Sequence, residues 1–100
     1  MKIVLISDNT DTQMGLRLVG IDGVVVHERE ELLQQLDLYY NDPDVAIVLV
    51  TTLVLKLDEK EILSRKLNQT RPLIVEIPDR HDSVDIGEVI DSYIREAIGL

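Results

Sequence analysis

The polar residues that could do chemistry in this chain follow two short apolar runs, at residues 3–6 and 45–50. In open α/β sheets, ligands bind beyond the carboxyl ends of the strands, at the point where the strand order reverses. If the two runs are the first and third strands of a sheet ordered 2-1-3-4, that point lies between them. The residues there are Ser7, Asp8, Asn9, Thr51 and Thr52. An enzyme or a phosphoacceptor domain would carry its reactive groups at this edge.

The protein classes that are known to carry a phosphate-binding loop or a phosphoacceptor at this edge need residues that this sequence lacks. No glycine-rich phosphate-binding loop follows the first run, and the chain has no Gly-Lys-Ser/Thr sequence. A response-regulator receiver needs an acceptor aspartate at the end of its third strand and a lysine after a later one. Asp8 could supply the first acid, but Thr51 occupies the acceptor position, and no lysine follows Ile77. The alternative that stays open is a degenerate receiver-like or small-ligand switch domain that uses an Asp8/Thr51 pocket.

The sequence also offers few residues that could bind a metal or act as a nucleophile. There is no cysteine, and the two histidines, His27 and His81, lie far apart in predicted turns. Asp79, Asp82 and Asp85 surround His81, yet an acidic loop followed by a helix cap accounts for them better than a metal cluster. We therefore predict no catalytic residue, no cofactor and no metal site.

Composition and charge narrow the range of partners. The 100 residues are 45% apolar, which fits one domain with a core of its own, and the net charge is −9. Such a surface is repelled by phosphate backbones and anionic lipid headgroups, so we expect no nucleic-acid binding and favour a basic protein partner. No run of about 18–20 apolar residues is present, so no direct membrane insertion is expected, and the first apolar run is too short for a secretory signal.

The apolar pattern predicts strands and helices in strict alternation. The run at 45–50 does not alternate with polar residues, which is typical of a strand covered on both faces at the centre of a parallel sheet. The predicted order is β-α-β-α-β-α-β-α in one α/β domain, residues 1–100. It is a three-layer sandwich with a four-stranded parallel sheet ordered 2-1-3-4 and two helices on each face, a receiver-like or Rossmann-like topology. The strands are expected at 3–6, 24–26, 45–50 and 73–77, and the helices at about 10–19, 28–40, 53–67 and 85–98.

Local signals refine these elements. Thr10 with Gln13 has the form of a capping box, and Asp58 with Glu61 forms another. Gly15 inside the first helix suggests close packing against the sheet or a partner. Whether residues 53–67 make one helix or two is left open. Glu76 interrupts the last apolar run and indicates an edge strand.

Four stretches of the chain are similar to a known family. Residues 15–21, Gly-Leu-Arg-Leu-Val-Gly-Ile, are similar to a family motif G-F-R-L-x-G-I/F at the end of the first helix. Residues 46–52, 72–78 and 88–99 match its third strand, its P-x-I-V-x-I-P strand and its terminal helix. The chain thus resembles the F subunit of the V-type (A/V-type) ATPases and ATP synthases. It departs from the family in the polar loop at 79–82 and in Thr52, where a glutamate is frequent.

The resemblance implies a non-catalytic subunit of the central stalk, the rotor. The F subunit binds the long D subunit, which forms the shaft, and through it the catalytic A/B head and the membrane rotor. The complex couples ATP hydrolysis or synthesis to proton or sodium transport, so the chain is expected in the cytoplasm, peripheral to the cell membrane. The terminal helix, residues 84–100, can change position in that family. The expected partner contacts are Leu16, Arg17, Ile21, Arg80, His81, Ile90, Tyr93 and Ile94.

Overall fold

The computed structural model describes residues 1–78. They form a sheet and helices in the order β1 (Lys2–Ser7), α1 (Thr10–Leu18), β2 (Asp22–Val25), α2 (Arg29–Tyr40), β3 (Val45–Thr51), α3 (Thr52–Leu55), α4 (Glu59–Asn68) and β4 (Leu73–Ile77). The predicted terminal helix lies outside the described residues, as do the predicted contacts Arg80, His81, Ile90, Tyr93 and Ile94. No helix within residues 1–78 is long and apolar enough to cross a bilayer.

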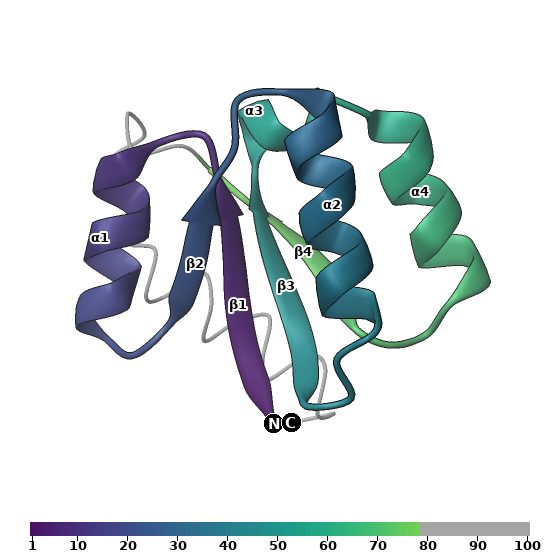
Figure 1. Cartoon of the computed structure of the whole chain (residues 1–100), viewed down its shortest axis with the longest axis horizontal. Helices are drawn as coiled ribbons and strands as arrows, with labels where there is room; N and C mark the ends of the chain where they lie inside the picture. Colours follow the sequence, from purple (N-terminus) through teal and green to yellow (C-terminus); the bar gives the residue numbers. More distant parts are fainter. Residues whose placement is uncertain (79–100) are drawn as a thin grey trace.

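All four strands are parallel and follow the order β2-β1-β3-β4 (Figure 1). This confirms the predicted α/β fold and the central position of β3. The strand has β1 on one side and β4 on the other, in registers that pair Leu49 with both Leu5 and Val75. Because β4 is an edge strand, Glu76 reaches solvent without breaking the core, as the sequence indicated.

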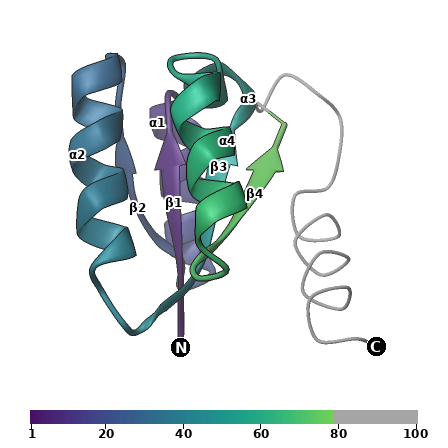
Figure 2. The same cartoon turned by 90° about the vertical axis from the view of Figure 1, so that its right-hand side faces the viewer.

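Successive residues of the strands face opposite sides of the sheet, which gives the protein two cores and three layers. On one side, Val4, Ile6, Val48 and Val50 pack with side chains from α2, α3 and α4. On the other side, a smaller core joins the sheet to α1; it consists of Leu5, Leu16, Leu49, Val75 and Ile77. Figures 1 and 2 show α2 and α4 side by side over the first face.

The start of α1 differs from the predicted capping box. Asn9, not Thr10, is the N-cap, and its Oδ1 accepts hydrogen bonds from the backbone N–H groups of Asp11 at 2.7 Å and Thr12 at 3.3 Å. Thr10 is already the first helical residue. Both arrangements fit the local sequence, and Asn9 is the cap because its backbone is extended, as an N-cap requires, whereas the backbone of Thr10 is already helical.

Two further boundaries were not settled by the sequence. Strand β2 begins at Asp22, two residues before the predicted start, because Gly23 pairs directly with Leu5 where a side chain would not fit. Residues 52–68 form two helices, since the backbone turns after Leu55 and Asp58 opens α4 by accepting a hydrogen bond from the N–H of Glu61 at 3.2 Å. The predicted cap at Asp58 is confirmed.

Candidate functional site

The edge where an enzyme of this fold would carry its reactive groups is closed by its own side chains. The Thr51 hydroxyl donates to Oδ1 of Asp8 at 2.7 Å and accepts the backbone N–H of Asp8 at 3.3 Å. The side chain of Thr51 is fully buried. The hydroxyl that stands in the acceptor position is therefore engaged on both its donor and its acceptor side.

The neighbouring turn is held in the same way. Ser7 is fully buried; its hydroxyl accepts the N–H of Asn9 and donates to the carbonyl of Asn9, both at 2.9 Å. Thr52 Oγ1 donates to the carbonyl of Ile77 at 3.3 Å. These bonds fix the turn after β1 and the junction between β3 and α3, so the polar residues of this edge hold the ends of the strands together.

Metal coordination finds no support among residues 1–78. That part of the chain contains no group of three histidine or carboxylate side chains placed to hold an ion. His27 is exposed at the start of α2, where its backbone N–H donates to Glu31 at 3.2 Å. The acidic residues around His81 lie outside the described residues.

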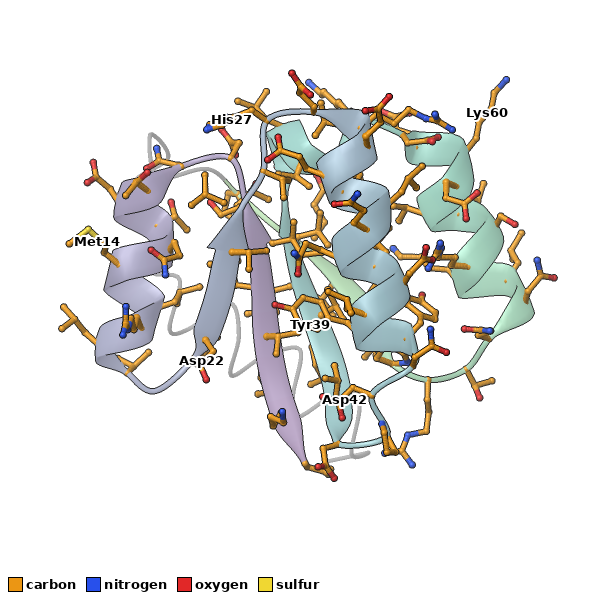
Figure 3. All side chains as sticks on the ribbon, viewed as in Figure 1. Met14, Asp22, His27, Tyr39, Asp42 and Lys60 are labelled. Carbon is orange, nitrogen blue, oxygen red and sulfur yellow. The ribbon has the colours of Figure 1, made fainter. Side chains whose placement is uncertain are left out.

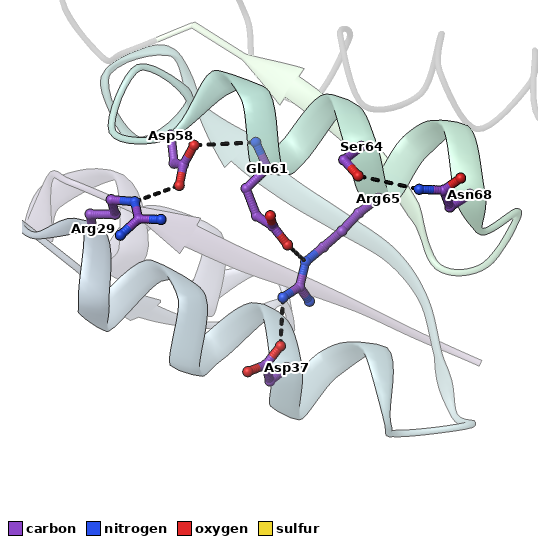
Figure 4. A network of polar contacts seen from close by, with 7 residues as sticks. All are labelled: Arg29, Asp37, Asp58, Glu61, Ser64, Arg65 and Asn68. Carbon is purple, nitrogen blue, oxygen red and sulfur yellow. Dashed lines mark hydrogen bonds and ion pairs between the residues drawn. The ribbon is translucent and has the colours of Figure 1, made fainter.

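Polar contacts instead join α2 to α4 (Figure 4). Arg65 donates to Glu61 at 2.9 Å and to Asp37 of α2 at 2.5 Å, and its guanidinium lies 5.1 Å from the ring centre of Tyr40. At the start of both helices, Arg29 Nε donates to Asp58 Oδ2 at 2.6 Å. That hydrogen bond, together with the one from the Glu61 N–H, holds the pKa of Asp58 below its ordinary value. The role of this network is to fix two helices to each other on one face of the sheet.

A groove runs between α3, α4 and the edge of β4. Its volume is about 400 Å³, and its lining mixes apolar side chains with two lysines and two glutamates, namely Thr52, Leu55, Lys56, Glu59, Ile62, Leu63, Lys66 and Glu76. The opposite charges balance within the groove, and Thr52 lies both in its lining and at the edge formed by the carboxyl ends of the strands.

The motif at residues 15–21 proves to be a helix ending. Gly20 has a φ of +90°, and its N–H donates to the carbonyl of Arg17 at 3.0 Å. The N–H of Ile21 donates to the carbonyl of Leu16 at 3.0 Å, and both side chains belong to the smaller core. This is a Schellman motif, in which a left-handed glycine and an apolar contact across it close the helix.

The predicted contacts on α1 therefore fall into two groups. Leu16 is only 6% exposed and Ile21 is partly buried, so both side chains hold α1 against the sheet. Arg17 is exposed, and no ion pair to it occurs among residues 1–78.

Three exposed apolar residues in or just after this helix were not named singly as predicted contacts, although Leu18 and Val19 belong to the motif at residues 15–21. Met14 is 58% exposed, Leu18 is 89% exposed and Val19, just after the helix, is 71% exposed (Figure 3 labels Met14). The signal was present, since a short helix that is apolar at positions 14, 16, 18 and 19 cannot bury them all on one face.

Comparison with known proteins gives one consistent result. The model of the family described as ATP synthase (F/14-kDa) subunit matches residues 3–96. The A-type ATP synthase F subunit of Methanocaldococcus jannaschii is 30% identical over 101 residues, covering 100% of this chain and 97% of that protein. The same subunit of Thermococcus kodakarensis is 33% identical over 106 residues, covering 100% and 96%, and that of Pyrococcus furiosus is 29% identical over 111 residues with the same coverage.

Proposed function

The chain belongs to the family of the ATP synthase (F/14-kDa) subunit, and from this premise we propose that it is a non-catalytic rotor subunit that binds the shaft, or D, subunit. The observation that carries the proposal is the end-to-end match, because the A-type ATP synthase F subunits align with the whole chain. In this role the chain sits on the cytoplasmic side of the membrane. Through the shaft it links the catalytic A/B head to the membrane rotor, and so ATP synthesis or hydrolysis to proton or sodium transport.

The closed edge supports a non-catalytic role. Covalent phosphoryl chemistry at this place would need a carboxylate where Thr51 stands, and Thr51 is buried and bonded to Asp8. A subunit that transmits torque needs stiff loops rather than a nucleophile. The bonds from Ser7, Thr51 and Thr52 provide such stiffness at the carboxyl ends of three strands.

The partner surfaces follow from exposure and from the family resemblance. Within residues 1–78, Arg17 offers an exposed cation on α1, whereas Leu16 and Ile21 contribute through the packing beneath it. The remaining proposed contacts lie outside the described residues, at Arg80, His81, Ile90, Tyr93 and Ile94 in and after the polar loop. Residues 84–100 are proposed as a helix that can change position.

Co-expression with the shaft subunit of the same organism tests the function. We expect the two proteins to elute together from gel filtration as a stable one-to-one complex. Clean separation of the two chains under low and moderate salt would contradict the proposal, because a permanent part of the rotor has to survive purification with its shaft.

Ligand screening separates this role from that of a switch domain. We expect Mg²⁺, acetyl phosphate and ATP to leave the melting temperature of the isolated chain unchanged. A rise of several degrees with one of these ligands, lost in Asp8→Ala, would instead favour a small-ligand site at Asp8 and Thr51.

A further inference from the structure

The outer face of α1 carries a contiguous apolar surface. Met14 and Leu18 stand one helical turn apart, so their side chains are neighbours, and Val19 follows directly. Their exposed fractions are 58%, 89% and 71%. Single exposed apolar residues are normal, but a group on one face of one helix marks a contact surface. We call Met14, Gly15, Leu18 and Val19 the α1 surface.

Gly15 has no structural reason within the described chain. A Cβ built at this position meets nothing within 4 Å, and the residue does not have a left-handed backbone. Glycine inside a helix is unfavourable relative to alanine. The missing side chain therefore neither relieves crowding nor permits a turn. What it does provide is bare helix backbone in the middle of an apolar surface, where another chain can approach closely.

The other residues of the motif at 15–21 differ from Gly15, because some of them have a role inside the fold. Leu16, Gly20 and Ile21 are accounted for by the helix ending and the core beneath it. Gly15, Leu18 and Val19 belong to the same short sequence and have no such internal role. They are the part of the motif that faces outward.

Charges around the α1 surface indicate the chemistry of its occupant. Asp22 is exposed at the start of the neighbouring β2 (Figure 3). Arg17 is the one basic residue of α1, and the whole chain carries a charge of −9. A partner with an apolar stripe and mainly basic flanks complements this arrangement.

We propose that the α1 surface binds a partner α-helix that has an apolar stripe with basic flanks. This helix crosses α1 at Gly15. This inference rests on the proposed function, in which the occupant is a helix of the shaft subunit. A helix fits because two helices pack closely when a small residue stands at the crossing point. Met14, Leu18 and Val19 then lie next to the crossing and lose their contact with water.

The test measures the affinity of the shaft subunit for matched variants of the chain, by calorimetry or by a binding assay with one partner immobilised on a surface. Gly15→Leu fills the crossing point with a strong helix former, and Leu18→Asp places a charge on the apolar surface. Leu38→Asp is the control, because Leu38 is an exposed leucine (62%) on α2 whose neighbours one turn away are polar. We expect both α1 variants to weaken binding by about tenfold or more, and the control to bind like the unchanged protein.

The proposed function and the proposed α1 surface would be contradicted by different results. If the unchanged chain binds the shaft subunit and Gly15→Leu and Leu18→Asp bind it equally well, the α1 surface is overturned while the function stands. If the unchanged chain does not bind the shaft subunit, the function falls and the α1 surface with it. Thermal unfolding of the isolated variants provides the folding check: Gly15→Leu is expected to melt no lower than the unchanged chain, so a loss of binding in it reports on contact and not on stability.

Discussion

Thr51 and Asp8 form two hydrogen bonds at the carboxyl ends of the two central strands. The Thr51 hydroxyl donates to the Asp8 carboxylate at 2.7 Å and accepts the Asp8 backbone N–H at 3.3 Å. They come from the ends of β3 and β1, which lie 43 residues apart in the chain. In a parallel sheet this is the place where ligands usually bind. Here the same position instead ties the turn after β1 to the end of β3.

Removing the Thr51 hydroxyl should lower stability. Thr51→Val keeps the shape of the side chain but loses both hydrogen bonds to Asp8 in a buried setting. We expect a loss of about 1–3 kcal/mol in the free energy of unfolding, measured by urea denaturation. Thr51→Ser, which keeps the hydroxyl, should lose clearly less. Equal losses in the two variants would show that packing, and not the hydrogen bonds, matters at this position.

Gly23 should not tolerate even one methyl group. A Cβ at this position would lie 2.7 Å from Leu5 Cβ and 2.9 Å from the Leu5 carbonyl oxygen. Gly23→Ala therefore forces β1 and β2 apart, at an expected cost of about 1–3 kcal/mol in unfolding free energy. Chemical denaturation measures this cost, and a variant as stable as the unchanged chain would contradict the close approach of the two strands.

Two other glycines should respond in opposite directions to alanine. Gly20→Ala puts a Cβ on a residue with φ of +90°, at an expected cost of about 1–2 kcal/mol. Gly15→Ala meets open space and removes a poor helix former, so stability should rise by up to about 1 kcal/mol. Thermal unfolding of the pair measures both, and a destabilised Gly15→Ala would mean that Gly15 is needed within the chain itself.

The Arg65 contacts should contribute more than the Arg29 contact. Arg65 is 18% exposed and engages Asp37, Glu61 and the ring of Tyr40, whereas Arg29 is 61% exposed and, within residues 1–78, forms an ion pair with Asp58 only. We expect Arg65→Met to cost about 1–2 kcal/mol in unfolding free energy and Arg29→Met clearly less, since water screens the exposed pair. Urea denaturation of the two variants at the same salt concentration compares them, and the reverse ranking would contradict the view that α4 is held through Arg65.

Acid should weaken the protein partly through Asp58. Its pKa lies below the ordinary value of 3.8, first because Arg29 donates to the carboxylate and then because the Glu61 N–H does. A lowered pKa means that the contribution to stability is present above pH 3.8 and is lost as the pH falls through the lower, folded-state pKa. We expect Asp58→Asn to show a shallower loss of stability below about pH 4, measured as melting temperature against pH.

Much of the fold was accessible from the sequence because it depends on hydrophobic pattern. The continuous apolar run at residues 45–50 predicted a strand covered on both faces, and the alternation of strands and helices predicted the parallel sheet and its order. Glu76 marked the edge strand. Family membership was also contained in the sequence, since it rests on the order and spacing of motifs along the whole chain.

What the sequence left open depends on contacts between distant segments. Asn9 and Thr10 are both good helix caps, and only the end of β1 selects Asn9. Leu16 and Leu18 are the same residue type two positions apart, yet one is buried and the other is in water.

The sequence by itself thus determined the order of strands and helices within residues 1–78, because this order follows from residue type and local periodicity. Only the tertiary structure shows that Thr51 forms a hydrogen bond with Asp8. It also shows that Gly23 packs too closely against Leu5 for a side chain and that Gly15 has open space around it. Burial, hydrogen bonding and exposure are relations between segments that the chain brings together only when it folds.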